Sequence, residues 1–473
     1  MLSWGALWSA LSGGPEPQGP LAGREFTNVV IDSRQAVNGS LFVALPGERQ
    51  DGHDYVVDAF HRGATAALVA HPVAGHDLTW PVAGALPVEA PAGPVCLQVA
   101  DSLAALQQVA AAWRQRLGAL RVVGVTGSLG KTSTKDAIAT VLAQRYCVLK
   151  NEGNLNNEIG LPLTLLRLTS EHEIAVLEMG MYARGEIARL VEMARPSVGV
   201  VTNVGPVHLE RLGTIENIAA AKAELPQGLP ADGVAVLNGD DQRVSAMAGL
   251  TPARKVIRYG LGPQNDLWAD EVESRGLAGT KMRLYYQGES RVLHLVSPGR
   301  HNVYVALAAA AVGLAEGLSW DEIIQGLSAQ GAVGRLRIRR GAGGSTLLDD
   351  AYNASPASML ADLDLLAEVD ARRLAILGDM LELGEVEEGG HREVGRRAGE
   401  VLSVLVTVGR RARWIAEEAL RRNPALVVRT YEDRNGVADW VRSQLQAGDC
   451  LLIKGSRGMA LEEVVAALCE EQA

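Results

Sequence analysis

The chain has 473 residues, of which 47% are hydrophobic and 21% charged, enough for about two to four domains with buried cores. Its formal net charge of −10, without a run of lysine or arginine residues, argues against a nucleic-acid-binding protein. The four cysteines are widely spaced and include no CxxC pair. This argues against a disulfide framework or a cysteine zinc site and favours a cytoplasmic protein.

Residues 1–100 are predicted to form the first unit. A short amphipathic helix, and not a signal peptide, is expected at 1–14, because this segment has no basic start and no clear cleavage site. Apolar and β-branched runs between turn residues predict three strands and one helix. The strands are at 27–34, 39–45 and 65–70, and the helix is at 55–64. The Pro/Gly/Ala-rich segment 72–94 is predicted to be a loop or linker.

The second predicted unit spans 101–332 and begins with a helix at 102–117. A strand at 121–125, a glycine-rich turn and a helix follow. Further apolar runs stand between helix-like segments, at 174–180, 198–205 and 233–241. This alternation is typical of a buried parallel sheet with crossover helices. The most apolar run, 303–318, is too short and too rich in alanine to span a membrane.

The third predicted unit spans 333–473 and has the same alternation of strands and helices. Its strand-like runs are at 345–352, 373–380, 404–409 and 450–456. They predict a second doubly wound α/β sheet, so the fold class is α/β with three domains. The acidic segment 382–391 is predicted to be a solvated loop.

The segment GVTGSLGKTST at 124–134 has the order strand, glycine-rich turn, Lys-Thr and helix, which is typical of a phosphate-binding loop. Lys131 is expected to contact the β- and γ-phosphates of ATP, and Thr132 to offer its hydroxyl group to Mg²⁺. Val125 stands where the common G-x-x-x-x-G-K-[ST] pattern has its first glycine. The other predicted ATP-binding residues of the turn are Gly127, Ser128, Gly130 and Ser133.

The spacing G-x-x-G-x-x-G-K-[ST]-[ST] of this turn resembles that of the Mur ligase family. Further stretches strengthen the resemblance, which covers nearly the whole chain: GNLNNEIGLPLTLL (153–166), VLEMGM (176–181), NVGPVHLERLGTIENIAAAKAEL (203–225), GRHN (299–302), LLDDAYNASPASM (347–359), LGDMLELGE (377–385) and IKGSRGM (453–459). The stretches 347–359 and 377–385 are the most specific. They resemble the members that join D-alanyl-D-alanine to a UDP-N-acetylmuramoyl-tripeptide.

The resemblance implies an N-terminal domain at 1–100 that binds the UDP-muramoyl-peptide, a central ATP-binding domain of the P-loop type at 101–332 and a C-terminal Rossmann-like domain at 333–473. The implied reaction is an amide ligation in peptidoglycan precursor synthesis. ATP converts the carboxylate of the tripeptide to an acyl phosphate, which the amine of D-alanyl-D-alanine attacks to give the pentapeptide, ADP and phosphate. We expect a cytoplasmic monomer that needs Mg²⁺ and has no nucleic-acid or membrane partner.

The resemblance also implies the catalytic and metal-binding residues. Glu178 ends an apolar strand, at the edge where α/β sheets bind ligands, and is expected to bind Mg²⁺ with Thr132. His208 is expected to hold a second Mg²⁺. Lys222 is expected to be carbamoylated, as N6-carboxylysine, and to offer that ion an oxygen ligand. The predicted catalytic set consists of Lys131, Glu178, His208 and Lys222.

The remaining implied contacts involve all three domains. For ATP they are Asn302, Arg335 and Asp350, and Val305 departs from the family pattern H-N-x-x-N, which leaves the contact to adenine open. The predicted substrate-binding residues are Ser33, Arg34, Asn154, Tyr352, Asn353, Lys454, Ser456 and Arg457. Of these, Ser33 and Arg34 are expected at the uridine diphosphate end, where Asp51 and His53 are further candidates.

Three alternatives stay open at this point. The first is another amide ligase of the superfamily, either the tripeptide-forming Mur ligase or an enzyme like folylpolyglutamate synthase. The absence of a D-N-P-R sequence weighs against the diaminopimelate-adding member. The second is a P-loop module that acts as a switch or motor, and the third is a relative that binds the precursor without turnover. The sequence does not distinguish diaminopimelate from lysine as the third residue of the acceptor peptide.

Overall fold

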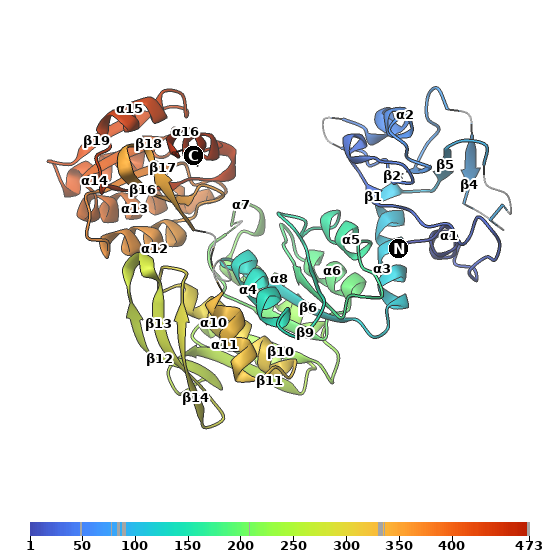
Figure 1. Cartoon of the computed structure of the whole chain (residues 1–473), viewed down its shortest axis with the longest axis horizontal. Helices are drawn as coiled ribbons and strands as arrows, with labels where there is room; N and C mark the ends of the chain where they lie inside the picture. Colours follow the sequence, from blue (N-terminus) through green and yellow to red (C-terminus); the bar gives the residue numbers. More distant parts are fainter. Residues whose placement is uncertain are drawn as a thin grey trace.

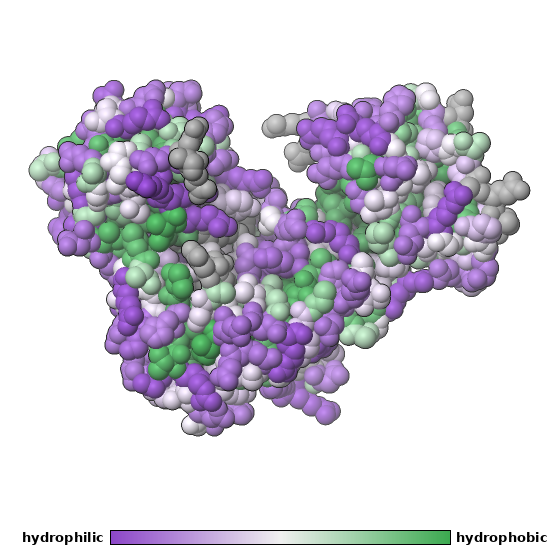
Figure 2. Space-filling model, viewed as in Figure 1, coloured by the Kyte–Doolittle hydropathy of each residue, from purple (hydrophilic) through white to green (hydrophobic). Residues whose placement is uncertain are grey.

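The computed structural model describes residues 1–47, 50–76, 78–82, 86–87, 91–207, 209–329, 334 and 336–470. His208 and Arg335, which the sequence predicts as a metal ligand and an ATP-binding residue, lie outside these described residues. Three sheets follow one another along the chain (Figure 1). The N-terminal and C-terminal parts lie on opposite sides of the central part, and the visible face is mainly hydrophilic with a few hydrophobic patches (Figure 2).

The N-terminal sheet is parallel and has the strand order β1-β2-β3-β5-β4. Its elements are α1 (Trp4–Ser12), β1 (Val29–Val30), β2 (Leu41–Val43), α2 (Val56–His61), β3 (Ala66–Val69), β4 (Thr79–Pro81) and β5 (Val95–Gln98). The predicted helix and strands therefore form. β4 lies inside the segment that was predicted to be a loop, and that part of the prediction is wrong.

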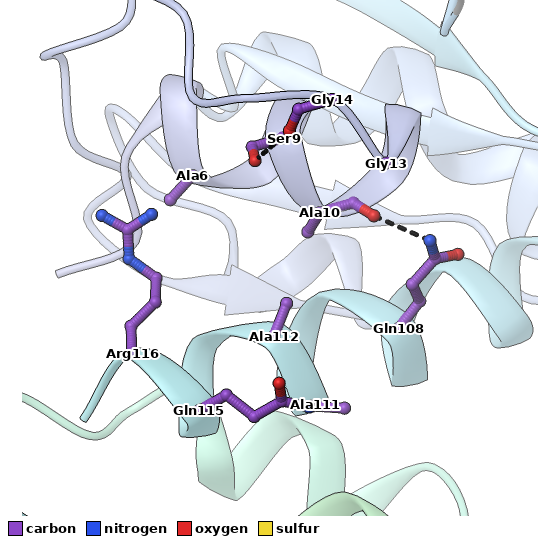
Figure 3. Close-up of a pocket in the computed structure, with 10 residues that line it drawn as sticks. All are labelled: Ala6, Ser9, Ala10, Gly13, Gly14, Gln108, Ala111, Ala112, Gln115 and Arg116. Atoms are coloured by element: carbon purple, nitrogen blue, oxygen red, sulfur yellow. Dashed lines mark hydrogen bonds between the residues drawn. The ribbon is translucent and has the colours of Figure 1, made fainter. Parts of the chain in front are cut away.

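Helix α1 attaches this sheet to the central part of the molecule. Ser3 caps its N-terminus by accepting a hydrogen bond from the Ala6 N–H, and Gly13 ends it in the left-handed conformation, with φ of +71°. Small side chains on α1 face α3 (Ser102–Arg116), and the Gln108 amide donates a hydrogen bond to the Ala10 carbonyl over 2.7 Å (Figure 3). Residues of both helices line a pocket of about 450 Å³.

The central sheet has nine strands, in the order β14-β13-β12-β11-β10-β9-β6-β8-β7. The strands are β6 (Arg121–Thr126), β7 (Val148–Lys150), β8 (Ile174–Glu178), β9 (Val198–Val201), β10 (Val234–Asn238), β11 (Lys255–Leu261), β12 (Leu267–Ser274), β13 (Thr280–Tyr286) and β14 (Glu289–Leu295). Pairing is parallel from β7 to β12, and β13 and β14 add an antiparallel extension. The extension was not predicted.

Helices cover both faces of the central sheet. They are α3, α4 (Lys131–Leu142), α5 (Gly160–Leu165), α6 (Glu186–Ala194), α7 (Leu209–Leu212), α8 (Ile215–Gln227), α9 (Gln242–Ala246), α10 (Asn302–Ala315) and α11 (Trp320–Ser328). Along β6, Val122 belongs to the core under α3, α6 and α8, whereas Val123 and Val125 belong to the core under α4, α10 and α11. Because both faces are covered, the strand is a continuous apolar run.

The C-terminal sheet has the strand order β15-β16-β20-β17-β18-β19 and is parallel except for β15. Its strands are β15 (Arg337–Gly341), β16 (Ser345–Asp350), β17 (Arg373–Gly378), β18 (Val404–Val408), β19 (Val427–Tyr431) and β20 (Cys450–Lys454). Its helices are α12 (Pro356–Ala367), α13 (Glu387–Val401), α14 (Arg413–Arg422), α15 (Val437–Gln444) and α16 (Glu462–Leu468).

The beginning of α13 corrects the prediction of a solvated loop at 382–391. The helix starts at Glu387, and His391 within it is fully buried. A Cβ atom at Gly390 would lie 2.6 Å from Pro356 of α12, so the glycine permits close packing of the two helices. Of the acidic residues of the segment, Glu382 and Glu385 precede the helix, and Glu388 lies on its exposed side.

The predicted fold class is confirmed, because the chain forms three α/β parts with mostly parallel strands. The domain boundaries near residues 100 and 332 stay a prediction. Among the described residues, no helix is both long enough and apolar enough to cross a lipid bilayer.

Candidate active site

A cavity of about 780 Å³ lies between the carboxyl ends of the central and C-terminal strands. Ligands of α/β sheets bind at this edge. Sixteen of the predicted site residues line it: Gly127, Ser128, Gly130, Lys131, Thr132, Ser133, Asn154, Glu178, Lys222, Asn302, Asp350, Tyr352, Asn353, Lys454, Ser456 and Arg457. The structure therefore brings together residues that lie more than 300 positions apart in the sequence.

The turn between β6 and α4 has the shape that a phosphate cradle requires. Gly130 caps the N-terminus of α4 with φ of +76°, and Gly127 has φ of +150°. A Cβ atom at Gly127 would lie 1.9 Å from the Thr202 hydroxyl oxygen, so only glycine fits there. The Lys131 ammonium group folds over the turn and donates to the carbonyls of Gly127 and Ser128, at 2.9 and 3.2 Å.

Hydrogen bonds to the loop after β9 also hold the turn in place. The Ser128 hydroxyl donates to the Gly205 carbonyl and accepts from the Gly205 N–H, at 3.0 and 2.8 Å. The Leu129 N–H donates to the side chain of Asn203 over 2.8 Å. Ser128 thus holds the loop after β9 against the turn. The exposed N–H groups at the start of α4, with the helix dipole behind them, fit a triphosphate.

Glu178, at the end of β8, is buried and makes two side-chain contacts. One carboxylate oxygen accepts from the Thr132 hydroxyl over 2.5 Å, and the other accepts from the Asn156 amide over 2.8 Å. Oxygen atoms of hydroxyl and carboxylate groups are the ligands that Mg²⁺ prefers, so the pair Thr132 and Glu178 fits this ion. Asn156 is thus the asparagine of this loop that contacts Glu178, and the predicted contact of Asn154 with substrate stays a prediction.

Asn151 is a buried residue that the sequence analysis missed. Its amide oxygen accepts from the Glu178 N–H over 2.9 Å, and its amide nitrogen donates to the Glu178 carbonyl over 3.0 Å. Its own carbonyl accepts from the buried Lys135 ammonium group over 2.7 Å. This arrangement fixes the end of β8 against α4. The only signal in the sequence is an asparagine directly after the short run CVLK at 147–150.

Lys222 lies on α8 with only 2% of its surface exposed. Burial, with a smaller contribution from the charge of Lys131, lowers the pKa of Lys222 well below its usual value. Within the described part of the chain, no hydrogen bond or ion pair involves its side chain. A lowered pKa increases the fraction of the amine that is unprotonated and hence nucleophilic.

Lys454 lies at the end of β20 in a buried cluster with two carboxylates. It forms ion pairs with Asp350 of the neighbouring strand β16 and with Asp362 of α12, the latter at 2.9 Å. Burial alone would lower the pKa of Lys454, but Asp362 and Asp350 together raise it. Burial raises the pKa of Asp350 against the effect of Lys454. Lys454 is therefore already paired, which limits its predicted role as a substrate-binding cation.

Asp362 was also missed by the sequence analysis. It stands within MLADLDLLA (359–367) of α12, between Ala361 and Leu363, and is 3% exposed. An acidic residue on the apolar side of a helix is the signal that could have found it, because such a carboxylate needs a buried partner.

Arg457, Tyr352 and Ser456 lie on the C-terminal side of the cavity. The Arg457 guanidinium group lies over the Tyr352 ring, 5.7 Å from its centroid. The Ser456 hydroxyl accepts from the Leu381 N–H over 3.0 Å. Asn353 binds its own loop, since its side chain accepts from the Ala354 N–H over 2.9 Å.

On the central side, α10 places Asn302 and Val305 at the cavity wall. The Asn302 amide donates to the Pro298 carbonyl over 2.7 Å, and Asn302 is one of the residues that line the cavity. Val305 is buried and apolar. Neighbouring Tyr304 donates to the Asp240 carboxylate over 3.1 Å. This wall can pack against a base, and Val305 offers it no hydrogen bond.

Ser33 and Arg34 do not line this cavity, because they lie in the N-terminal part. Ser33 is buried, and Arg34 forms an exposed ion pair with Asp32 at 2.7 Å. Nearby, the buried His53 ring bonds to the Asp51 carboxylate over 2.6 Å and accepts from the Ala70 N–H over 2.8 Å. Both ring nitrogens of His53 are thus already hydrogen-bonded, so His53 and Asp51 do not suit a metal ion.

Three domain models match the chain in order. They are described as the Mur ligase family catalytic domain (25–114), the Mur ligase middle domain (125–313) and the Mur ligase glutamate ligase domain (334–457). The UDP-N-acetylmuramoyl-tripeptide–D-alanyl-D-alanine ligase of Bacillus subtilis strain 168 is 39% identical over 466 residues, which cover 96% of each chain. The chain belongs to the Mur ligase family.

Solved structures of the Mur ligase family have the same fold over nearly the whole chain. A crystal structure of MurF from Acinetobacter baumannii has a TM-score of 0.83 and 30% identity, and the match covers 98% of each chain. MurF ligase from Thermotoga maritima, solved in complex with ADP, has a TM-score of 0.77 and 29% identity over 93% of this chain and 96% of its own. The resemblance to Mur ligases in the sequence is thus confirmed.

Proposed function

We propose that the chain is an ATP-dependent amide ligase that joins D-alanyl-D-alanine to UDP-N-acetylmuramoyl-tripeptide in peptidoglycan precursor synthesis. The products are UDP-N-acetylmuramoyl-pentapeptide, ADP and phosphate. One observation carries the proposal. One cavity joins a phosphate cradle to the strand ends of a second α/β sheet, in a chain 39% identical over 96% of its length to an enzyme named for this reaction.

The chemistry follows from the poor reactivity of a carboxylate. The terminal carboxylate of the tripeptide attacks the γ-phosphate of ATP, ADP leaves, and an acyl phosphate forms. The dipeptide amine then attacks the acyl carbon, its nitrogen loses a proton, and phosphate leaves with the bonding electrons. Negative charge on the phosphoryl oxygens is the main obstacle in both steps, so fixed positive groups provide most of the rate enhancement.

Lys131 and the N–H groups at the start of α4 are proposed to hold the phosphates of ATP. Thr132 and Glu178 supply oxygen ligands for Mg²⁺, and His208 is proposed to bind a second ion. When bound, Mg²⁺ neutralises phosphate charge. Asn302, Arg335 and Asp350 are proposed for the base and ribose, with an apolar contact from Val305 in place of a hydrogen bond.

Lys222 is proposed to carry a carbamate formed with CO₂. The support is chemical: an unprotonated amine is the species that reacts with CO₂, and burial lowers the pKa of Lys222 strongly. Addition of the amine to CO₂ forms an N–C bond and releases one proton, and the product is an anionic oxygen ligand. Protein prepared with ¹³CO₂ should give a ¹³C carbamate signal that Lys222→Met lacks. A wild-type spectrum without that signal contradicts the modification.

The N-terminal domain, 1–100, is proposed to bind the UDP end of the long substrate, with Ser33 and Arg34 as contacts. Asn154, Tyr352, Asn353, Lys454, Ser456 and Arg457 are proposed on the peptide side. Binding energy from the remote UDP end can then position the reacting carboxylate. The domain boundaries near 100 and 332, a monomeric state and a cytoplasmic location are part of the same proposal.

Phosphate release from ATP tests the proposal directly. UDP-N-acetylmuramoyl-tripeptide and D-alanyl-D-alanine should both be required, with mass spectrometry showing the pentapeptide product. Parallel reactions replace the dipeptide with diaminopimelate, lysine or glutamate, which represent the other ligases of the superfamily. Phosphate release that does not depend on the dipeptide, or that is faster with one of these amino acids, would reject the assignment.

A further inference from the structure

The segment Asp379–Leu383 follows β17 and lines the cavity through its last three residues, Leu381, Glu382 and Leu383. Glu382 has φ of +63°, which is uncommon for a residue other than glycine. Such strained residues persist only where the surroundings hold them, and they cluster at functional sites. The segment therefore needs fixed anchors.

The loops that follow the neighbouring strands β20 and β18 provide part of this anchoring. The Leu381 N–H donates to the Ser456 hydroxyl over 3.0 Å, and the Ser456 N–H donates to the Asp379 carbonyl over 3.0 Å. On its other side, the buried Asp379 carboxylate accepts from the Ala412 N–H over 2.7 Å. These bonds connect the segment to the loops after β20 and β18.

His391 holds the middle of the segment from behind. Its Nε2 atom accepts a hydrogen bond from the Met380 N–H over 3.0 Å, and its Nδ1 atom donates to the Glu387 carbonyl over 2.7 Å. His391 and Met380 are both fully buried. Because Nε2 must accept, the ring has to be neutral. Burial lowers the pKa of His391, which favours this neutral form.

We propose that Asp379–Leu383 forms one wall of the subsite for the incoming dipeptide, and that His391 is the positioning residue that holds this wall. The inference rests on the proposed ligase function. The chemistry of the wall suits a small dipeptide with two methyl groups and a carboxylate. Leu381 offers an apolar side chain. Arg457 offers a cation, and it follows Ser456, whose hydroxyl accepts the hydrogen bond from the Leu381 N–H.

Two substitutions at His391 separate its two hydrogen bonds. His391→Gln places an amide oxygen where Nε2 accepts and so keeps the bond from Met380. His391→Asn keeps a donor near Glu387 but is too short to reach Met380. His294→Asn, at an exposed histidine on β14, is the matched control. Leu381→Ala tests the wall directly. It leaves the core intact, so it still tests the proposal if the substitutions at His391 prevent folding.

Steady-state kinetics should then show a selective effect. In His391→Asn and Leu381→Ala, we expect the KM for D-alanyl-D-alanine to rise about tenfold or more, while the KM values for ATP and for the UDP-tripeptide change less than about twofold. His391→Gln should stay within about threefold of the wild type for all three substrates. The control should behave as the wild type.

The outcomes separate this inference from the proposed function. If Leu381→Ala leaves the KM for the dipeptide unchanged, or raises all three KM values equally, the wall does not belong to the dipeptide subsite. If His391→Gln is as impaired as a folded His391→Asn, the bond to Met380 is not what positions the wall. If the wild type itself releases phosphate without the dipeptide, the ligase assignment fails, and the inference fails with it.

Discussion

The Thr132 hydroxyl donates a hydrogen bond to the Glu178 carboxylate over 2.5 Å, and this contact joins the first turn of α4 to the end of β8. The two residues lie 46 positions apart in the chain. Their oxygen atoms meet where the parallel strands end, directly beside the phosphate cradle. Asn151 and Asn156 hold Glu178 in this place from the other side.

Glu178→Gln should reduce ligase activity without affecting the fold. Glutamine keeps an oxygen that can accept from Thr132 but removes the negative charge that attracts Mg²⁺. We expect kcat/KM to fall about 100-fold or more, with less than about 1 kcal/mol change in the free energy of unfolding. Glu192→Gln, at an exposed position on α6, is the control. Activity that stays near the wild-type value would remove Glu178 from the catalytic set.

Gly127→Ala should damage the phosphate cradle specifically. The added Cβ atom would lie 1.9 Å from the Thr202 hydroxyl at a backbone φ of +150°. We expect a loss of about 1–3 kcal/mol in stability and a large loss of ADP affinity, measured by thermal unfolding and calorimetry. Gly153→Ala is a matched control, since its φ is also positive but no atom lies within 4 Å of the added Cβ. Equal loss of ADP affinity in both variants would mean that the close approach to Thr202 is unimportant.

The cradle and the strand-end residues were predictable because their signals are local. A glycine-rich turn between an apolar strand and Lys-Thr indicates a phosphate loop, and polar residues at the carboxyl ends of β8, β16 and β20 indicate one edge of a sheet. Parallel strands bring such residues together whatever the loops between them. Glu178 was expected at this edge on that ground, whereas Asp350 and Lys454 were named from the family resemblance; all three line the cavity.

The remaining features depend on contacts that the sequence does not encode locally. The antiparallel extension formed by β12–β14 has mixed polar and apolar residues, because one side of it is partly exposed, and its strands lack the continuous apolar pattern of β6. Asn151 and Asp362 act through buried partners contributed by other elements. The acidic turn at 387–391 is helical because Gly390 and His391 pack against neighbouring segments, which its composition does not indicate.

Lys454→Met should destabilise the C-terminal part strongly. The substitution leaves Asp350 and Asp362 buried without their cation. Breaking a buried ion pair by removal of one partner costs about 3–5 kcal/mol, and we expect a loss of this size in the free energy of unfolding at neutral pH. Urea unfolding measures it. A loss below about 1 kcal/mol in the free energy of unfolding would show that water or another group stabilises the two buried carboxylates in place of Lys454.

The pH dependence of Lys454→Met follows from the direction of the Asp350 shift. Burial raises the pKa of Asp350 above 3.8 even in the wild type, and loss of Lys454 should raise it further. A carboxyl group whose pKa is raised by folding binds more protons in the folded state, so stability falls as pH rises through that pKa. The deficit of the variant should therefore shrink as the pH is lowered from 7 toward about 4. A deficit that is constant over this range would contradict a buried carboxylate as its cause.

Asp51→Asn should show the opposite pH dependence in the N-terminal part. Hydrogen bonds from the His53 N–H and side chain lower the pKa of Asp51 from 3.8 to about 2. A carboxyl group with a lowered pKa stabilises the fold above its unfolded value of 3.8, and this contribution is lost as the pH falls toward about 2. The wild type should therefore unfold at higher urea concentration than Asp51→Asn at neutral pH, and the two curves should converge below about pH 4. Asp54→Asn, three residues away, is the control and should show no such convergence. If Asp51→Asn and the wild type have equal stability at neutral pH, the Asp51 carboxylate does not hold the buried His53 ring in place.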